Sequence, residues 1–379
     1  MHGKVASRQS FGSKHLGRPV LKVFPSRLAL PRRLGNLAMS SKGRTAVEET
    51  DGGAFKRTDS EFRNWIRPDS EFEPEAGRYH LYISYACPWA CRCLTFLYLK
   101  GLEGAIGLSI THPTWQKTKP DDSSDMHTGW TFANPDDAPF SSHTGWGSFG
   151  CEGCVPDDVN GAKYVRDLYE LSKGQTGSKF TVPVLWDKKK GVIVNNESSE
   201  IVQILNDQFN SLAKNPGLDL FPDDLRSSID EVNSWTYPCI NNGVYRCGFA
   251  QSQKAYEDAF GDLFGALDRV ESILSKQRYI AGDRLTEADI RLFQTLIRFD
   301  VVYVVYFKCN RNFIHEFPHM SDYTKELYSI PGVQKAVNID HIKTHYFTSH
   351  PTLNHYAIVP LGCSPWWEGS HNRESVHSK

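Results

Sequence analysis

The chain has 379 residues, of which 40% are apolar, with 43 Lys and Arg against 44 Asp and Glu. Ten of the basic residues and none of the acidic ones fall in residues 1–47, which leaves 33 basic and 44 acidic residues in the rest. That acidic remainder argues against a general nucleic-acid-binding protein, and the lack of any run of 18 apolar residues excludes a membrane-spanning helix. The length and apolar content predict two packed domains.

Residues 1–47 have the composition of an organellar transit peptide, because they are rich in Arg, Lys and Ser and contain no acid. No apolar block follows the first basic residues, so a secretory signal is not expected. We expect import into the chloroplast rather than the mitochondrion. The alternative is a disordered basic tail, in which case the protein would be cytoplasmic.

The first folded domain is expected at residues 78–210, after a polar arm at 48–77 that lies over it. Alternating and periodic apolar residues predict the following elements: a strand at 78–85, a helix at 86–100, a strand at 108–111, a helix at 164–172, a hairpin of strands at 181–186 and 192–195, and a helix at 198–209. This order is that of a thioredoxin-like α/β domain. The Gly- and Pro-rich stretch 112–158 is expected to form a wall over a pocket.

The second domain is expected to be all-helical and to span residues 226–350, after a linker at 211–225 and before an extended tail at 351–379. Helices are predicted at 226–237 and 254–275, the second with an apolar face of period 3.6. Thr286 and Asp289 predict a helix cap, followed by an apolar helix at 290–307.

Nine cysteines and no secretory signal argue against a framework of disulfides. Cys151 and Cys154 have CxxC spacing, but no second pair accompanies them, so no metal is expected there. Cys91 and Cys93 are expected to be small buried residues of a helix.

Cys87 is the strongest candidate for a catalytic residue. It stands in Cys-Pro-Trp-Ala, where a strand leads into a helix, and the N–H groups and dipole of that helix should favour the thiolate. Because Ala90 occupies the place of a second cysteine, a thiol from outside must regenerate Cys87, and glutathione is the expected one. The alternative is a buried, inert cysteine.

Two further pairs of residues could hold a peptide-like ligand. Val182 precedes Pro183, and a residue before a cis-proline can pair its backbone with an extended peptide. Glu197 and Ser198 open the next helix, where they could bind the amino and carboxylate groups of a γ-glutamyl residue. The alternatives are an edge-strand proline and simple helix capping.

These features, in this order, resemble the glutathionyl-hydroquinone reductases, or xi-class glutathione transferases, which are related to the omega class. The resemblance covers residues 60–362 and is carried by GRYHLYISYACPWA (77–90), GWTF (129–132), TVPVLWD (181–187), NNESSEI (195–201), INNGVYRCGFA (240–250), LTEADIRLF (285–293), FKCN (307–310) and HIKTHYFTSH (341–350). It implies a thioredoxin-like domain followed by an all-α glutathione-transferase domain.

The resemblance also implies the chemistry. Cys87 would take the glutathionyl group from a glutathionyl-hydroquinone, and a second glutathione would release oxidised glutathione. Tyr245 matches the proton donor or acceptor, while Tyr303 and Tyr346 would hydrogen-bond near the thiolate and lower its pKa. The implied glutathione site consists of Trp130, Lys179, Phe180, Thr181, Val182, Glu197 and Ser198. Lys179 stands where the family more often has Arg, which makes its role less certain.

The implied partners are glutathione, as co-substrate, and aromatic quinone conjugates, with a homodimer as the assembly. Two other functions stay open: an omega-like thiol transferase or dehydroascorbate reductase, and a non-catalytic module on the same scaffold. Without the resemblance, each of the three tyrosines would be taken as a core or interface aromatic residue.

Overall fold

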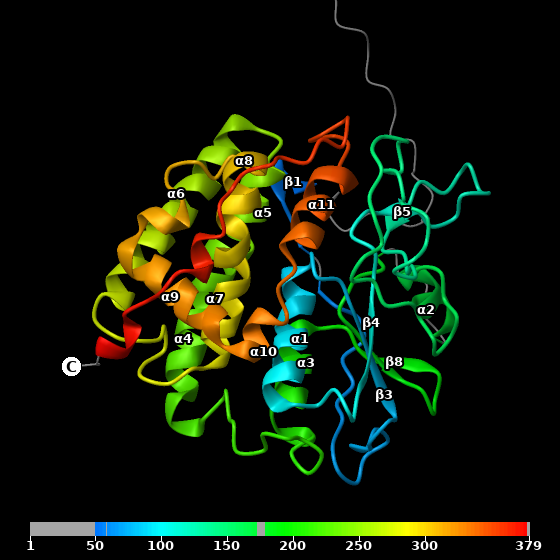
Figure 1. Ribbon diagram of the computed structural model, residues 1–379, viewed down its shortest axis with the longest axis horizontal. Coiled ribbons are helices and arrows are strands. Elements are labelled where there is room, and N and C mark those ends of the chain that lie inside the picture. Colours follow the sequence, from blue (N-terminus) through cyan, green and yellow to red (C-terminus); the bar gives the residue numbers. More distant parts are fainter. Residues whose placement is uncertain (1–49, 58, 173–178, 377–379) are drawn as a thin grey trace, which may run out of the picture. The chain divides into compact units, whose positions relative to one another are not determined.

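The computed structural model describes residues 50–57, 59–172 and 179–376, which form an α/β domain followed by a helical domain (Figure 1). The expected transit peptide lies outside the described residues. The two-domain fold class predicted from the sequence is confirmed. Among the helices that the structure describes, none is long and apolar enough to cross a membrane.

The sheet of the first domain has four strands in the order β4-β3-β7-β8. They are β3 (Tyr79–Ile83), β4 (Gly107–Ile110), β7 (Val184–Asp187) and β8 (Val192–Asn195). β3 and β4 are parallel and the other pairs are antiparallel, so the predicted hairpin is β7–β8. All five residues of β3 are buried, because helices cover both faces of the sheet.

The helices of this domain are α1 (Pro88–Lys100), α2 (Val165–Leu171) and α3 (Ser198–Gln203). In Figure 1, α1 and α3 lie on one side of the sheet and α2 on the other. α1 ends at Gly101, whose φ of 66° suits glycine. The single helix predicted at 198–209 changes to π-helical geometry at Ile204–Gln208.

The polar arm runs across both domains rather than over the first alone. It contains the short strands β1 (Thr50–Asp51) and β2 (Ala54–Phe55), and the Phe55 ring packs against Tyr245 and Phe249 of the helical domain. Farther along, Arg63 forms a β-bridge with Asn195 at the end of β8. The arm therefore covers the boundary between the two domains.

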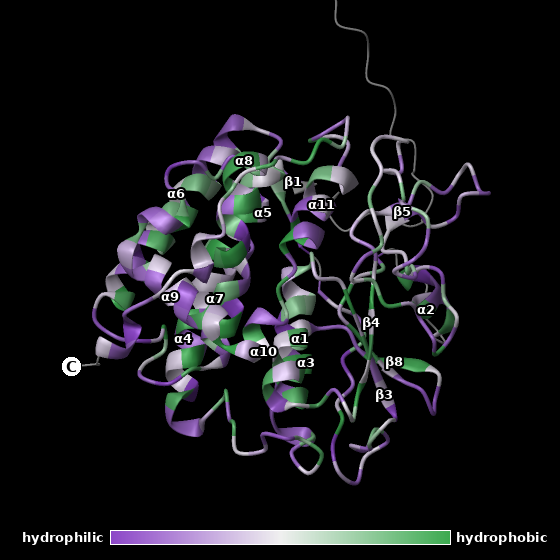
Figure 2. Cartoon of the chain, in the orientation of Figure 1, coloured by the Kyte–Doolittle hydropathy of each residue, from purple (hydrophilic) through white to green (hydrophobic). Residues whose placement is uncertain are grey.

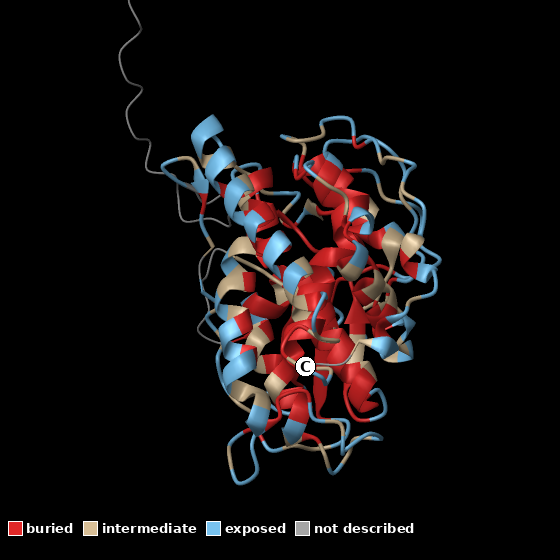
Figure 3. Cartoon of the chain, turned by 90° about the vertical axis from the view of Figure 1, so that its left-hand side faces the viewer, coloured by how far each residue is buried: buried red, intermediate tan, exposed pale blue. Residues whose placement is uncertain are grey.

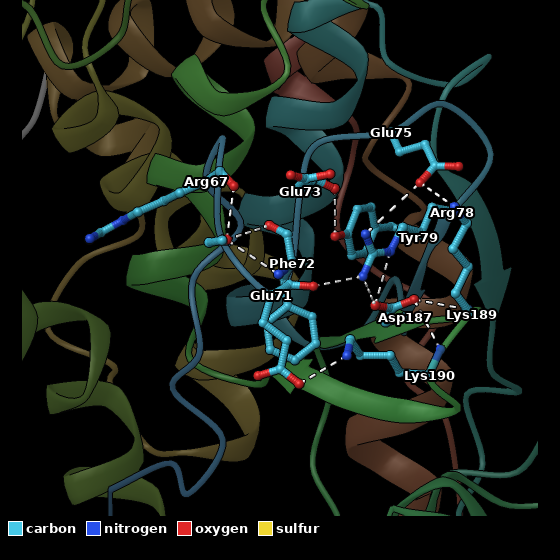
Figure 4. A network of polar contacts seen from close by, with 11 residues as sticks. Arg67, Glu71, Phe72, Glu73, Glu75, Arg78, Tyr79, Asp187, Lys189 and Lys190 are labelled. Carbon is cyan, nitrogen blue, oxygen red and sulfur yellow. Dashed lines mark hydrogen bonds and ion pairs between the residues drawn. The ribbon is translucent and has the colours of Figure 1, made fainter.

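A polar network fixes the last part of the arm to the sheet (Figure 4). Arg78 lies just before β3 and forms a buried ion pair with Asp187 of β7, with Nη2 2.5 Å from Oδ2. The guanidinium group of Arg78 also donates a hydrogen bond to the carbonyl oxygen of Glu71. Lys189, in the β7–β8 turn, pairs with Glu75 of the arm.

The stretch 112–158 contains only two short strands, β5 (Gln116–Lys117) and β6 (Thr128–Gly129), which pair with each other. Its three tryptophans have different places. Trp115 and Trp130 are buried and line the pocket described below, as expected for a wall. Trp146 is 44% exposed and contacts Tyr356 of the C-terminal tail.

The second domain is helical, as predicted. Its helices are α4 (Arg226–Thr236), α5 (Gly243–Gly248), α6 (Gln253–Leu274), α7 (Glu287–Arg298), α8 (Val304–Tyr306), α9 (Pro318–Ser329), α10 (Pro331–Gln334) and α11 (Ile339–Ser349). π-helical turns at Tyr237–Asn241 and Phe299–Tyr303 join α4 to α5 and α7 to α8. Apolar and polar residues alternate along the outer helix α6 (Figure 2), whose outward side is exposed while the interior is buried (Figure 3).

The predicted cap at the start of α7 is present. The backbone N–H and the hydroxyl of Thr286 both donate to the Asp289 carboxylate, at 2.8 Å. The tail beyond α11 has little regular structure, with 3-10 turns at Trp366–Glu368 and Arg373–Ser375. It is anchored by Arg373, which is buried and donates to carbonyl oxygens at the end of α6.

Candidate active site

A pocket of about 640 Å³ lies between the arm, the first domain and the helical domain. The first domain contributes the start of α1, the segment before β7 and the start of α3. The helical domain contributes residues of α5 and α11, and the arm contributes residues 55–57 and 59–61. Three segments far apart in the sequence thus enclose one site. No group of three or more His, Cys, Asp or Glu that could hold a metal occurs among the described residues.

Cys87 faces this pocket as the N-cap residue of α1. It is half-buried, and its carbonyl oxygen accepts the first hydrogen bond of the helix, from Cys91 N at 2.9 Å. Its thiol donates to the carbonyl oxygen of Val182 at 3.5 Å. The Val182–Pro183 peptide bond is cis, as the sequence predicted. The Val182 carbonyl therefore contacts the sulfur instead of standing free.

The pKa of Cys87 differs from the prediction. Removal from water raises the pKa of the thiol above its ordinary value, although the N–H groups of Ala90 and Trp89 and the charges of Arg298 and Arg57 act to lower it. The helix terminus acts in the expected direction, but desolvation outweighs it. Forming the thiolate therefore depends on every nearby positive group.

Arg298, at the end of α7, is the most deeply placed of these groups, with no exposed surface. Its guanidinium donates to the carbonyl oxygens of Tyr85 at 2.8 Å and Ala86 at 3.2 Å, and to the sulfur of Cys91 at 3.2 Å. No carboxylate among the described residues forms an ion pair with it. A buried cation without an anion is costly, so this charge is available to a thiolate at Cys87. No motif in the sequence points to Arg298.

Glu197 and Ser198 lie together at the start of α3 and both line the pocket. Burial opposes the charge of Glu197, but hydrogen bonds from Ser199 and Ser60 and the charge of Arg92 hold its pKa below the ordinary value. The hydroxyl of Ser198 is buried and has no hydrogen-bond partner among the residues that the structure describes. An unpaired buried hydroxyl facing a pocket is what a polar ligand group would satisfy.

The other residues expected at the glutathione site divide into two groups. Trp130, Lys179, Thr181 and Val182 line the pocket. Phe180 does not, because its ring is turned away to pack against His127 and Tyr169. Its contact with the ligand stays a prediction that this side-chain position does not support.

The three tyrosines meet at their hydroxyl groups. Tyr346 OH lies 2.5 Å from Tyr245 OH and 3.0 Å from Tyr303 OH. Burial raises the pKa of all three phenols, that of Tyr303 to about 12, so they are neutral at ordinary pH. Tyr245 and Tyr346 line the pocket, whereas Tyr303 lies behind them.

Tyr303 and Tyr346 were expected to hydrogen-bond near the thiolate of Cys87, but the hydrogen bonds of their hydroxyl groups go to other tyrosines. The hydroxyl of Tyr346 bonds to those of Tyr245 and Tyr303, and the hydrogen bond of the Cys87 thiol goes to the carbonyl oxygen of Val182. The tyrosines therefore form a chain of neutral hydroxyls that ends at the pocket through Tyr245 and Tyr346. Such a chain can deliver a proton, but its hydroxyls do not hydrogen-bond to the sulfur of Cys87.

Several pocket residues were not predicted from the sequence. Arg57 of the arm stacks 3.8 Å from the Trp89 ring and donates to Asn242 at 3.1 Å. Ser60, also from the arm, donates to Glu197 at 3.0 Å. His345 of α11 stacks on Trp130 with ring centroids 4.5 Å apart. The arm residues lie in a polar stretch without a motif, so only their place in the fold reveals them.

Comparison with known proteins identifies the family. Residues 86–208 match the model "Glutathione S-transferase, N-terminal domain", and residues 253–326 match "Glutathione S-transferase, C-terminal domain". The glutathionyl-hydroquinone reductase YqjG of Escherichia coli is 41% identical over 84% of this chain and 91% of its own length. The glutathionyl-hydroquinone reductase PcpF of Sphingobium chlorophenolicum is 42% identical over 83% of this chain and 91% of its own.

Solved structures agree. The glutathione transferase Xi of Phanerochaete chrysosporium is 48% identical, with a TM-score of 0.73 over 82% of this chain and 98% of its own. The Xi glutathione transferase ECM4 of Saccharomyces cerevisiae, solved in complex with glutathione, is 37% identical, with a TM-score of 0.75 over 83% of this chain and 99% of its own. The chain is therefore an enzyme of the glutathionyl-hydroquinone reductase family, the xi class of glutathione transferases.

Proposed function

We propose that the protein reduces glutathionyl-hydroquinones to hydroquinones, with glutathione as the reductant. The observation that carries the proposal is that one pocket presents both the Cys87 thiol and the neutral hydroxyls of Tyr245 and Tyr346. A thiol alone suits any disulfide exchange. A proton donor beside it is what cleavage of a carbon–sulfur bond at an aromatic ring additionally needs.

The glutathionyl group would occupy the first-domain side of the pocket. Its γ-glutamyl end would meet the charged Glu197 and the unpaired hydroxyl of Ser198, and its backbone would meet Val182. Trp130, Lys179 and Thr181 would complete the subsite. Relatives from Escherichia coli and Saccharomyces cerevisiae have been solved with glutathione bound, which supports this assignment.

The reaction would proceed in two balanced steps. In the first, the Cys87 thiolate attacks the sulfur of the glutathionyl group, the bond from that sulfur to the ring breaks, and the ring carbon takes up a proton, giving a Cys87–glutathione disulfide and the hydroquinone. In the second, the thiolate of another glutathione attacks the glutathionyl sulfur of that disulfide. Oxidised glutathione leaves and the Cys87 thiolate returns.

Tyr245 is the proposed proton donor, because it lines the pocket and its raised pKa keeps the proton in place until the ring develops charge. Tyr346 bridges Tyr245 and Tyr303, so it can return a proton along the hydroxyl chain. Arg298 and the N–H groups of Trp89 and Ala90 would stabilise the thiolate.

The test is release of menadiol from glutathionyl-menadiol in the presence of glutathione, followed by chromatography. The wild type should release it and Cys87→Ser should not, and equal rates would overturn the proposal. Mass spectrometry of the wild type treated with substrate alone should find one glutathione adduct, on Cys87.

A second candidate is an omega-like thiol transferase, since relatives from Schizosaccharomyces pombe and Saccharomyces cerevisiae are named omega-like glutathione S-transferases. Disulfide exchange needs Cys87 but no proton delivery to carbon. If Tyr245→Phe lowered both activities equally, the assignment of Tyr245 as ring-protonating donor would be wrong.

We further propose a homodimer and import into a chloroplast. The exposed apolar side chains of Tyr356, Ile358 and Leu361 in the tail support an interface, because a two-fold contact is the commonest way to cover such groups. Sedimentation equilibrium tests the dimer. A fusion of residues 1–47 to a fluorescent protein tests the import.

A further inference from the structure

The Cys151–Cys154 turn lies outside the pocket and has no part in the proposed reaction. Both cysteines are free and buried, and with Ala133 they form a small apolar cluster separate from the main core. The partly buried side chain of Phe140 packs against that cluster. The two residues between the thiols are exposed, so the cluster lies just beneath the surface.

The backbone turn brings the Cα atoms of the two cysteines within the range that a disulfide can span. Cys154 N donates to the carbonyl oxygen of Cys151 at 3.0 Å, which closes a four-residue turn, and Gly153 takes the φ of 80° that such a turn requires at its third position. The ends of a turn of this kind have Cα atoms less than about 7 Å apart. Disulfides span Cα separations of about 4.4–6.8 Å, so closure needs rotation of side chains rather than movement of the chain.

The turn is clamped from both sides. His112 bonds to the carbonyl oxygen of Gly150 at 3.0 Å, just before the turn, and Val155, just after it, forms a β-bridge with Ile110 of β4. A side chain in place of Gly153 would approach Asn338 and His341 to 3.2 Å. These contacts hold the backbone of the turn in place on both sides.

The turn also contacts the helix that carries pocket residues. The ring of His341, in α11, lies 2.6 Å from the carbonyl oxygen of Glu152 and packs edge-on against Tyr85, two residues before Cys87. One turn farther along, the same helix carries His345 and Tyr346, which line the pocket. A change at the turn is therefore two contacts away from the catalytic loop.

We propose that Cys151 and Cys154 form a reversible dithiol–disulfide site that is oxidised by glutathione disulfide and alters the active site through His341. One thiolate attacks glutathione disulfide, forming a mixed disulfide and releasing one glutathione. The second thiol then attacks the protein sulfur of that mixed disulfide and releases another. Overall, the dithiol loses two electrons and two protons, and one glutathione disulfide becomes two glutathione molecules.

The oxidant, glutathione disulfide, is also a product of the proposed reaction. The two cysteines would therefore become oxidised as this product accumulates, and this link rests on the proposed function. Burial raises the pKa of both thiols, that of Cys154 to about 12. The thiolates are therefore scarce, and oxidation is slow compared with turnover. A reaction this slow is suited to regulating the enzyme over many turnovers rather than to taking part in each one.

The first experiment needs no enzymatic activity. Full-length Cys87→Ser protein is equilibrated in glutathione buffers with increasing glutathione disulfide, then quenched with acid and alkylated. The masses of its proteolytic peptides are measured by mass spectrometry. The peptide with both cysteines should lose two hydrogens and take up no alkyl group, while Cys154→Ser should carry one glutathione on Cys151. Cys247 and Cys309, which hydrogen-bond to each other but lie in the main core, are the internal control and should stay reduced. A Cys151–Cys154 pair that remains reduced, or takes a lasting glutathione adduct, would overturn the proposal.

The second experiment compares enzyme with intact Cys87 before and after treatment with glutathione disulfide. The initial rate should change at least twofold on treatment, and Cys151→Ser/Cys154→Ser should show no change. If the disulfide forms but the rate is constant, the proposed coupling to the active site is wrong. The mass measurement does not depend on turnover. A failure of the proposed function can therefore be distinguished from a failure of the dithiol–disulfide proposal.

Discussion

The guanidinium Nε of Arg298 donates a hydrogen bond to the carbonyl oxygen of Ala86, the residue directly before Cys87, at 3.2 Å. Arg298 thus joins the last turn of α7, in the helical domain, to the loop that presents the catalytic thiol. Its positive charge acts in the same direction as the N–H groups of α1, since both lower the pKa of Cys87 against the effect of burial.

Arg298→Met should raise the pKa of Cys87, because it removes a positive charge that favours the thiolate. The rate of alkylation by iodoacetamide, followed against pH, should rise at a higher pH than in the wild type, and Arg298→Lys should restore part of the shift. The carbonyl oxygens of Tyr85 and Ala86 would lose their donor, which should also lower the free energy of unfolding by about 1–3 kcal/mol.

Arg373→Met is the matched control for this loss of stability. Arg373 is equally buried and also donates to backbone carbonyls, but at the end of α6, away from the pocket. The Arg373→Met protein should be less stable than the wild type, but the pH dependence of its alkylation by iodoacetamide should be unchanged. Identical profiles for all three proteins would show that Arg298 only supports the fold.

Tyr245→Phe should slow hydroquinone release about 100-fold or more, the ordinary contribution of a positioned acid, with little change in disulfide exchange. The two rates are measured with glutathionyl-menadiol and with a small mixed disulfide of glutathione. Tyr303→Phe is the control, since its hydroxyl bonds to Tyr346 behind the pocket. If Tyr303→Phe were as slow as Tyr245→Phe, the position of Tyr245 at the pocket would not explain its role.

Ser198→Ala should weaken glutathione binding about tenfold while leaving the free energy of unfolding within about 0.5 kcal/mol of the wild type. Within the described part of the chain the hydroxyl has no partner, so its removal breaks no hydrogen bond there, but a ligand carboxylate would lose a charge-assisted one. Ser199→Ala is the matched control, because Ser199 Oγ donates to Glu197 at 2.9 Å. Titration calorimetry measures glutathione binding, and urea unfolding measures the free energy of unfolding. A Ser198→Ala protein that is less stable than the wild type but binds glutathione equally well would contradict the assignment.

The sequence was sufficient for the features that short segments determine. Alternation at residues 78–85 and the Pro88 position predicted β3, α1 and the N-cap place of Cys87 within a few residues. Thr286 and Asp289 predicted the start of α7 for the same reason, since a cap involves only four residues. These motifs are local, so the physics that forms them can be read from neighbouring side chains.

The remaining parts of the site depend on contacts between distant segments. Arg298 is 211 positions from Cys87 along the chain, and Arg57 reaches Trp89 from a polar arm whose composition indicates only exposure. The pKa of Cys87 was predicted with the wrong sign, because the helix dipole is visible in the sequence whereas the enclosure that desolvates the sulfur is not. Phe180 was placed at the ligand by its position in a motif, but packing with Tyr169 turns its ring away.

The last prediction concerns stability in acid and rests on His80 in β3. Burial lowers the pKa of His80 to about 4, whereas in the unfolded chain it is about 6.5. Below pH 6.5 the unfolded chain therefore binds a proton that the folded protein excludes, and stability falls as the pH decreases towards 4. Between pH 6.5 and 4.5 the wild type should lose about 2–3 kcal/mol more than His80→Gln, which can still bond to Ser109 but does not titrate. Urea unfolding at a series of pH values measures the difference, and parallel curves for the two proteins would show that the pKa of His80 is the same in the folded and unfolded states.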